Sequence, residues 1–143
     1  MPNLIYSEIR VRNLELSVRF YKALGLVPKN KGEMPDGTSF VWVWDKKTKQ
    51  LVELWNAPRG SQFFEPFQIG KMFDPRLAFS VESADPMLRK LKRLGGRVTR
   101  DFNLGKYRLS MVSDPDGYCI EVLSWTNPRD HADDGVPLLE LVL

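Results

Sequence analysis

The amino-acid sequence contains the same pattern twice, at an interval of about 70 residues. Val11 and Val81 are 70 positions apart, and Gly25 and Gly95 have the same separation. Each copy reads as one strand, one helix and three further strands, and the last strand of each copy carries a glutamate. Two copies of a βαβββ unit predict a pseudo-symmetric fold with a cavity between paired sheets.

The boundaries of the repeated elements follow from residue alternation and turn residues. Segments that alternate between apolar and polar types, rich in β-branched and aromatic residues, are typical of strands. Asn13 and Ser83 are suited to cap the two helices, and Gly25 and Gly95 to end them. The expected strands are 4–11, 26–30, 40–44 and 50–55 in the first copy, and 76–81, 97–102, 106–113 and 118–124 in the second. We therefore expect one α+β domain, residues 1–125, made of the tandem βαβββ modules 4–55 and 75–124, with residues 126–143 as a C-terminal tail.

Composition excludes several classes of protein. Of the 143 residues, 43% are hydrophobic and 27% are charged, as in an ordinary soluble globular chain. The 21 basic residues only slightly exceed the 18 acidic ones and no groove-reading motif accompanies them, so nucleic acid is not an expected partner. No apolar run suits a membrane span or a signal peptide, and we expect a cytoplasmic protein. The single cysteine, Cys119, excludes an intrachain disulfide.

Strand alternation assigns the side chains to two faces of the predicted sheets. Side chains at i and i+2 share a face, so the apolar members of each strand pack against the helices and their neighbours point the other way. A sheet facing bulk water would tolerate polar side chains there. The tryptophan, cysteine and leucines among them favour instead a partly enclosed surface, where charges are paired or bound to a ligand. The residues expected on this surface include Tyr6, Glu8, Arg10, Glu53, Trp55, Arg76, Cys119 and Glu121.

Five motifs carry a resemblance to a known superfamily. They are Ile9-Arg10-Val11, the run SVRFYKALGL over residues 17–26, Val52-Glu53-Leu54, the run LAFSV over residues 77–81, and Asp114-Pro115-Asp116-Gly117 with the strand that follows it. In this order, and doubled, they resemble the vicinal oxygen chelate superfamily, which includes glyoxalase I, extradiol dioxygenases and bleomycin-resistance binding proteins. The resemblance covers about residues 4–125. It implies that the eight strands form a cupped mixed sheet with the helices outside, commonly completed by dimerisation, and we expect a homodimer.

The resemblance also implies where a metal ion would bind. Metal-dependent members ligate a divalent ion through His, Glu, His and Glu on four strands. At these positions the chain has Tyr6, Glu53, Arg76 and Glu121, and its one histidine, His131, lies outside the repeats. A guanidinium has no lone pair for a cation, and Arg76 would repel a divalent ion. We therefore expect no cofactor, with Arg76 between the two carboxylates in place of the metal. A divalent metal such as Mg²⁺ on the two glutamates is the alternative.

Three functions are consistent with this pattern. The first, which we favour, is binding of a small anionic or aromatic molecule in the sheet cavity without a metal, through Tyr6, Glu8, Arg10, Trp55 and Cys119. The second is a lyase or isomerase of the glyoxalase type. In that case Glu121 or Glu53 removes a proton next to a carbonyl, and Arg76 or a divalent metal stabilises the enediolate. The third is a non-catalytic dimeric interaction module. The sequence leaves open whether the protein is an enzyme.

Overall fold

The computed structural model describes residues 6–64 and 77–127, and within these ranges each half of the sequence folds as one βαβββ module. The first module contains β1 (Ser7–Arg10), α1 (Leu14–Ala23), β2 (Val27–Glu33), β3 (Ser39–Trp44) and β4 (Leu51–Asn56). The second contains β5 (Leu77–Ser80), α2 (Ala84–Arg93), β6 (Arg97–Leu104), β7 (Tyr107–Ser113) and β8 (Cys119–Trp125). The predicted repeat is therefore confirmed as a repeat of structure.

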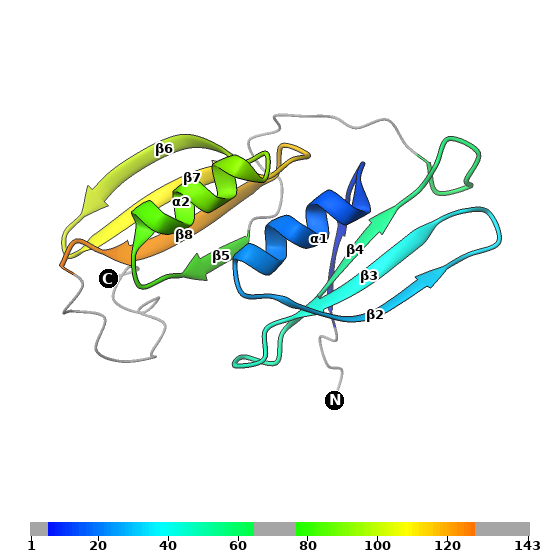
Figure 1. Ribbon diagram of the computed structural model, residues 1–143, viewed down its shortest axis with the longest axis horizontal. Helices are drawn as coiled ribbons and strands as arrows, with labels where there is room; N and C mark the ends of the chain where they lie inside the picture. Colours follow the sequence, from blue (N-terminus) through cyan, green and yellow to red (C-terminus); the bar gives the residue numbers. More distant parts are fainter. Residues whose placement is uncertain (1–5, 65–76, 128–143) are drawn as a thin grey trace.

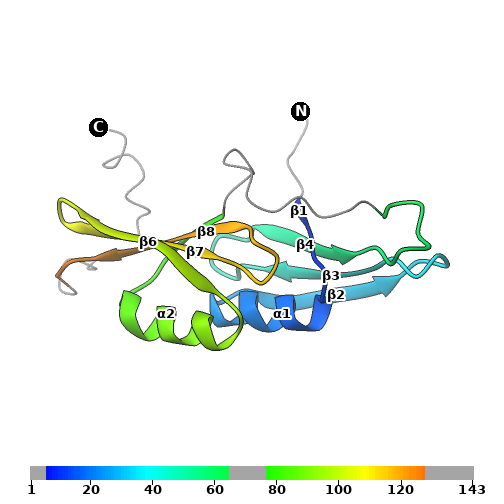
Figure 2. The same ribbon diagram turned by 90° about the horizontal axis from the view of Figure 1, so that it is seen from above.

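The strands form two four-stranded mixed sheets, one from each module, which confirms the predicted α+β fold. The strand order is β1-β4-β3-β2 in the N-terminal sheet and β5-β8-β7-β6 in the C-terminal sheet. In each sheet the first strand of the module is parallel to its neighbour, the last strand, and the other pairs are antiparallel. Figure 1 shows the two sheets side by side. In Figure 2, α1 and α2 lie next to each other on the same side of both sheets.

One hydrophobic core joins the two modules. Phe20 and Tyr21 of α1 and Leu91 of α2 are fully buried in it, together with helix-facing strand residues such as Leu54 and Ile120. Burying a large apolar side chain of this kind contributes about 1.5–3 kcal/mol relative to leaving it exposed. Because residues of both modules share this core, each module depends on the other for its stability.

Both helices begin and end near the predicted residues. The side chain of Asn13 accepts a hydrogen bond of 2.9 Å from the backbone N–H of Leu16 and so caps α1. Ser83 occupies the equivalent position before α2, but its side chain forms no capping hydrogen bond. Gly25 and Gly95 follow the two helices at φ of +94° and +91°, in the left-handed region that favours glycine. No helix in the described part of the chain is long and apolar enough to cross a membrane.

The turn between β7 and β8 connects the modules through hydrogen bonds. The Tyr21 hydroxyl donates to the carboxylate of Asp114 at 2.8 Å, and the backbone N–H of Arg12 donates to Asp116 at 2.8 Å. Ser17 Oγ adds a longer contact of 3.4 Å to Asp116. Burial raises the pKa of Asp114 to about 6 and also raises the pKa of Asp116. The Asp-Pro-Asp-Gly motif thus attaches the second module to the segment before α1 and to the middle and last turn of α1.

Several sequence predictions concern residues outside the described ranges. Arg76 and His131 lie there, as do residues 1–5 and most of the tail expected at 126–143. The place of Arg76 between two carboxylates therefore stays a prediction, and so do the boundaries of the domain and its tail.

Candidate ligand-binding site

The N-terminal sheet has one face against the helices and one facing away from them, which we call the open face. Ile9 of β1, Val41 of β3 and Leu54 of β4 pack into the core, so their neighbours along each strand point to the other side. This open face is the side away from α1 in Figure 2. It carries Tyr6, Glu8, Arg10, Phe40, Trp42, Glu53 and Trp55.

Two carboxyl groups form a pair at the centre of the open face. Glu8 and Glu53 are register partners in the parallel strands β1 and β4. Burial, the charge of Glu53 and a hydrogen bond with Glu53 raise the pKa of Glu8. The raised pKa means that the Glu8 carboxyl group holds a proton more readily than a free glutamate does. The pair therefore offers two adjacent carboxyl groups to a ligand.

Trp42 completes this centre. Its indole Nε1 donates a hydrogen bond of 2.5 Å to Glu53 Oε2 from the adjacent position in β3. The rings of Tyr6 and of Phe40, two residues earlier in β3, both lie near it, with ring centroids 5.9 Å and 6.1 Å from that of Trp42. Our sequence prediction of ligand-binding residues did not include Trp42. The pairing of the strands expected at 40–44 and 50–55 is the signal that could have placed it opposite Glu53.

The aromatic surface continues along the strands. Phe40 is the register partner of Trp55, and Arg10 is the partner of Trp55 on its other side. Gly32 of β2 lies under the Phe40 ring, since a Cβ atom built on this glycine would be 2.5 Å from Phe40 Cζ. The absence of a side chain at residue 32 therefore lets the Phe40 ring lie over β2.

The structure divides the predicted site residues between the two sheets. Tyr6, Glu8, Arg10, Glu53 and Trp55 share the open face of the N-terminal sheet, as expected. Glu121 and Cys119 lie in β8 of the C-terminal sheet. Glu121 is opposite Met111 and Ala78, and Cys119 is half-buried opposite Ser113. Both glutamates thus occupy equivalent strands of the repeat, and a direct meeting of Glu53 with Glu121 stays a prediction.

Comparison with known proteins assigns the family. A sequence model described as Glyoxalase/Bleomycin resistance protein/Dioxygenase superfamily matches residues 4–122, which includes both modules. The chain belongs to this superfamily. The predicted resemblance is therefore confirmed, and the repeated glyoxalase-type module accounts for the equivalent positions of Glu53 and Glu121.

Relatives of the glyoxalase superfamily extend over most of the chain. Lactoylglutathione lyase of Neisseria meningitidis serogroup A is 29% identical over 143 aligned positions, covering 93% of this chain and 95% of that protein. Lactoylglutathione lyase of Escherichia coli O157:H7 is 28% identical, with 84% and 90% covered. A glyoxalase family protein from Bacillus cereus has a TM-score of 0.73 at 15% identity, covering 89% of this chain and 96% of its own. Glyoxalase I of Leishmania major has a TM-score of 0.65 at 22% identity, with 87% of each chain covered.

The resemblance predicts that Tyr6, Glu53, Arg76 and Glu121 occupy the metal-ligand positions of this superfamily. Within residues 6–64 and 77–127, no three His, Cys, Asp or Glu side chains are grouped so as to hold a metal ion. Glu53 accepts a hydrogen bond from Trp42, and the ring of Tyr6, which is predicted to replace a histidine ligand, is tilted against the same indole with ring centroids 5.9 Å apart. The second histidine position holds Arg76, which has no lone pair to donate. That the donor set of a glyoxalase metal site is incomplete in this chain therefore stays a prediction.

Proposed function

We propose that the protein binds a small aromatic molecule, neutral or cationic, on the open face of its N-terminal sheet and without a metal ion. The observation that carries this proposal is the arrangement of Glu8, Glu53 and Trp42. Two carboxyl groups face each other on neighbouring strands, and the indole of Trp42 donates a hydrogen bond to one of them. Such a centre orients polar groups of a ligand, while the surrounding rings supply apolar contact area.

The aromatic surroundings favour a flat ligand. Tyr6, Phe40, Trp42 and Trp55 are all half-buried, so a part of each ring remains accessible. Ring stacking is worth about 0.5–1.5 kcal/mol per pair beyond the area that it buries. A ligand of one or two rings can contact more than one of these side chains.

The charge of the site selects among such ligands. We expected an anionic or an aromatic ligand from the sequence, and the paired carboxyl groups of Glu8 and Glu53 support the aromatic choice. An anion placed there would meet the negative charge of the pair, whereas an amine could donate to it. A cation over an aromatic face gains a further 0.5–2 kcal/mol, as an approximate range.

Two indole compounds of opposite charge test this proposal. Tryptamine carries an ammonium group and indole-3-acetate carries a carboxylate on the same ring system. We expect calorimetry to show binding of tryptamine and at least about tenfold weaker binding of indole-3-acetate, about 1.4 kcal/mol. Glu53→Gln should weaken tryptamine binding, and Glu82→Gln, at an exposed position before α2, should leave it unchanged. Equal binding of both compounds, or an equal effect of both variants, would contradict the proposal.

A second candidate function is catalysis by a glyoxalase-type lyase or isomerase. The names of the Neisseria and Escherichia relatives favour it, since both are lactoylglutathione lyases. In this case Glu53 or Glu121 would act as the base, and Arg76 would supply the charge that stabilises an enediolate. An assay of lactoylglutathione formation with the purified protein tests this function. Turnover lost in Glu53→Gln, with Glu82→Gln unaffected, would establish it, and absence of turnover would exclude lactoylglutathione as the product.

A further inference from the structure

A shallow groove of about 390 Å³ lies between α1 and α2. It is on the helix side of the sheets, so it is separate from the open face. The C-terminal halves of both helices form its walls. The groove is lined by Arg19, Lys22 and Ala23 from α1, and by Lys90, Arg93 and Leu94 from the end of α2.

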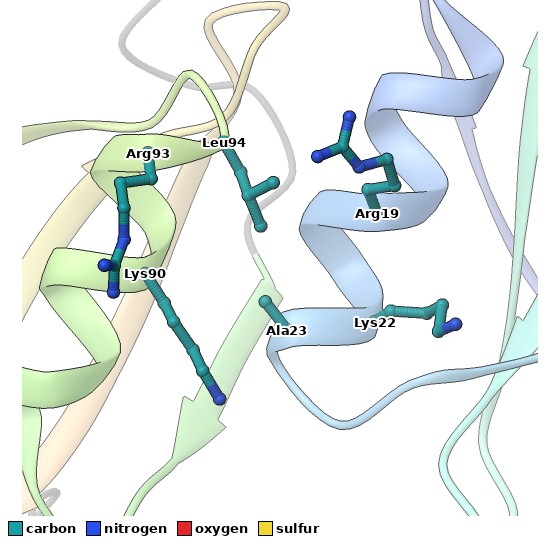
Figure 3. Close-up of a pocket in the computed structure, with 6 residues that line it drawn as sticks. All are labelled: Arg19, Lys22, Ala23, Lys90, Arg93 and Leu94. Carbon is teal, nitrogen blue, oxygen red and sulfur yellow. The ribbon is translucent and has the colours of Figure 1, made fainter.

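The side chains give this groove an apolar floor and a basic rim. In Figure 3, Ala23 and Leu94 point into the space between the helices. Arg19 extends toward that space from α1 and Lys90 from α2, while Lys22 and Arg93 run along the outer flanks. Two cations are therefore directed at the groove, and two more can reach it by rotation of their flexible side chains.

The positive charge of the rim is not compensated by neighbouring acids. In the described ranges none of the four cations forms an ion pair or a side-chain hydrogen bond. The acid at the start of α2, Asp85, binds Arg108 at 2.9 Å instead. The C-terminus of a helix carries about half a negative charge. Two helix ends therefore offset about one of the four positive charges, and about three remain.

We propose that this groove binds a small polyphosphate group, either free or as part of a phosphorylated metabolite. The floor offers no hydrogen-bond donor, so affinity must come from several cations that act on one ligand. A ligand with three or four negative charges matches the remaining charge, whereas one monovalent anion would engage only part of it. The volume is within the range of small-molecule sites, about 300–1,000 Å³.

Calorimetry with inorganic tripolyphosphate tests this site in the full-length protein. Arg19→Gln with Lys90→Gln removes the two cations that point into the groove. Lys31→Gln with Lys46→Gln removes the same charge from exposed positions in the N-terminal module, and serves as the matched control. Arg19→Lys with Lys90→Arg keeps the charge and reports whether the helices tolerate substitution. Circular dichroism confirms that each variant is folded.

We expect the groove variant to bind tripolyphosphate at least about tenfold more weakly than the wild type, with the control and the charge-preserving variant close to wild type. Binding should also weaken as sodium chloride is added. Adenosine triphosphate in place of tripolyphosphate distinguishes the two sources. If adenosine triphosphate binds more tightly than tripolyphosphate, and the groove variant loses this difference, the ligand is a phosphorylated metabolite. Equal affinity of the two compounds indicates free polyphosphate. No binding of either compound at about 1 mM, or equal losses in the groove and control variants, would overturn the proposal.

Discussion

The buried carboxyl group of Asp114 leads to a prediction about stability and pH. Its side chain is 3% exposed, accepts the hydrogen bond from Tyr21 and belongs to the turn that connects the modules. Burial raises its pKa from the ordinary value of 3.8 to about 6. Below pH 3.8 the folded and unfolded chains both hold this proton, and above about pH 6 neither does. Between these values the folded chain binds more protons, so the free energy of unfolding falls as the pH rises.

The size of this effect follows from the shift. The free energy of unfolding changes by about 1.4 kcal/mol for each pH unit in this interval. Over the interval from pH 3.8 to about pH 6 the change is therefore about 3 kcal/mol. Asp114→Asn keeps the shape of the side chain and cannot titrate. Its free energy of unfolding, measured relative to wild type, should therefore rise by about 3 kcal/mol between about pH 4 and about pH 7.

Urea denaturation of both proteins across this pH range measures the difference. Asp36→Asn is the control, because hydrogen bonds from Thr38 lower the pKa of Asp36. Because a lowered pKa confines the effect of Asp36 to pH values below about 3.8, the stability of this variant relative to wild type should stay constant between about pH 4 and about pH 7. Parallel stability curves for Asp114→Asn and wild type would refute the proposed burial of a titrating Asp114.

Three further predictions concern the core, the open face and the assembly. Leu91→Ala removes a fully buried side chain from the shared core and should cost about 2–5 kcal/mol in urea denaturation, with both modules unfolding in a single transition. Two separate transitions would show that the modules are independent. Gly32→Ala forces the Phe40 ring to move, because the new Cβ would lie 2.5 Å from Phe40 Cζ. We expect a cost of about 1–3 kcal/mol in stability together with weaker tryptamine binding, and unchanged binding would exclude Phe40 from the site. If two chains of the homodimer expected from the sequence complete each site with Glu53 from one and Glu121 from the other, Glu121→Gln should also weaken tryptamine binding, and mixing it with Glu53→Gln chains should restore some of the binding. A monomeric mass in light scattering would exclude this arrangement.

The doubled pattern was sufficient to predict the architecture from the sequence. Alternation with turn residues located β3, β4, β7 and β8 to within about one residue, because these strands are apolar on the helix side. The predictions were less accurate for β2, which was expected to end at residue 30 and extends to Glu33. The sequence of its second half, Lys-Asn-Lys-Gly-Glu, has no apolar alternation. This part of β2 is a strand because it pairs with β3, after an irregularity between Pro28 and Asn30. Tertiary pairing here decides a conformation that the local sequence does not favour.

Only a part of the candidate site was predicted, because strand register between distant segments decides the rest. Alternation places Glu8 and Glu53 on the correct face, but their position opposite each other depends on the register of β1 against β4, which are 40 or more residues apart in the chain. The hydrogen bond from Trp42 depends on the register of a hairpin whose turn carries no strong type signal. The role of Asp114 and Asp116 was also not predicted beyond that of a turn. Their partners Tyr21 and Arg12 are in the other module and only folding brings them together.

Binding of tryptamine to protein depleted of metal is the most direct test of the proposed metal-free site. The protein is dialysed against a chelator, its metal content is measured by elemental analysis, and calorimetry is repeated before and after addition of Mg²⁺ or Zn²⁺. Our proposal predicts the same affinity in each case, with loss of affinity in Glu53→Gln. A stoichiometric metal ion that survives purification, or binding that appears only after metal is added, would contradict it.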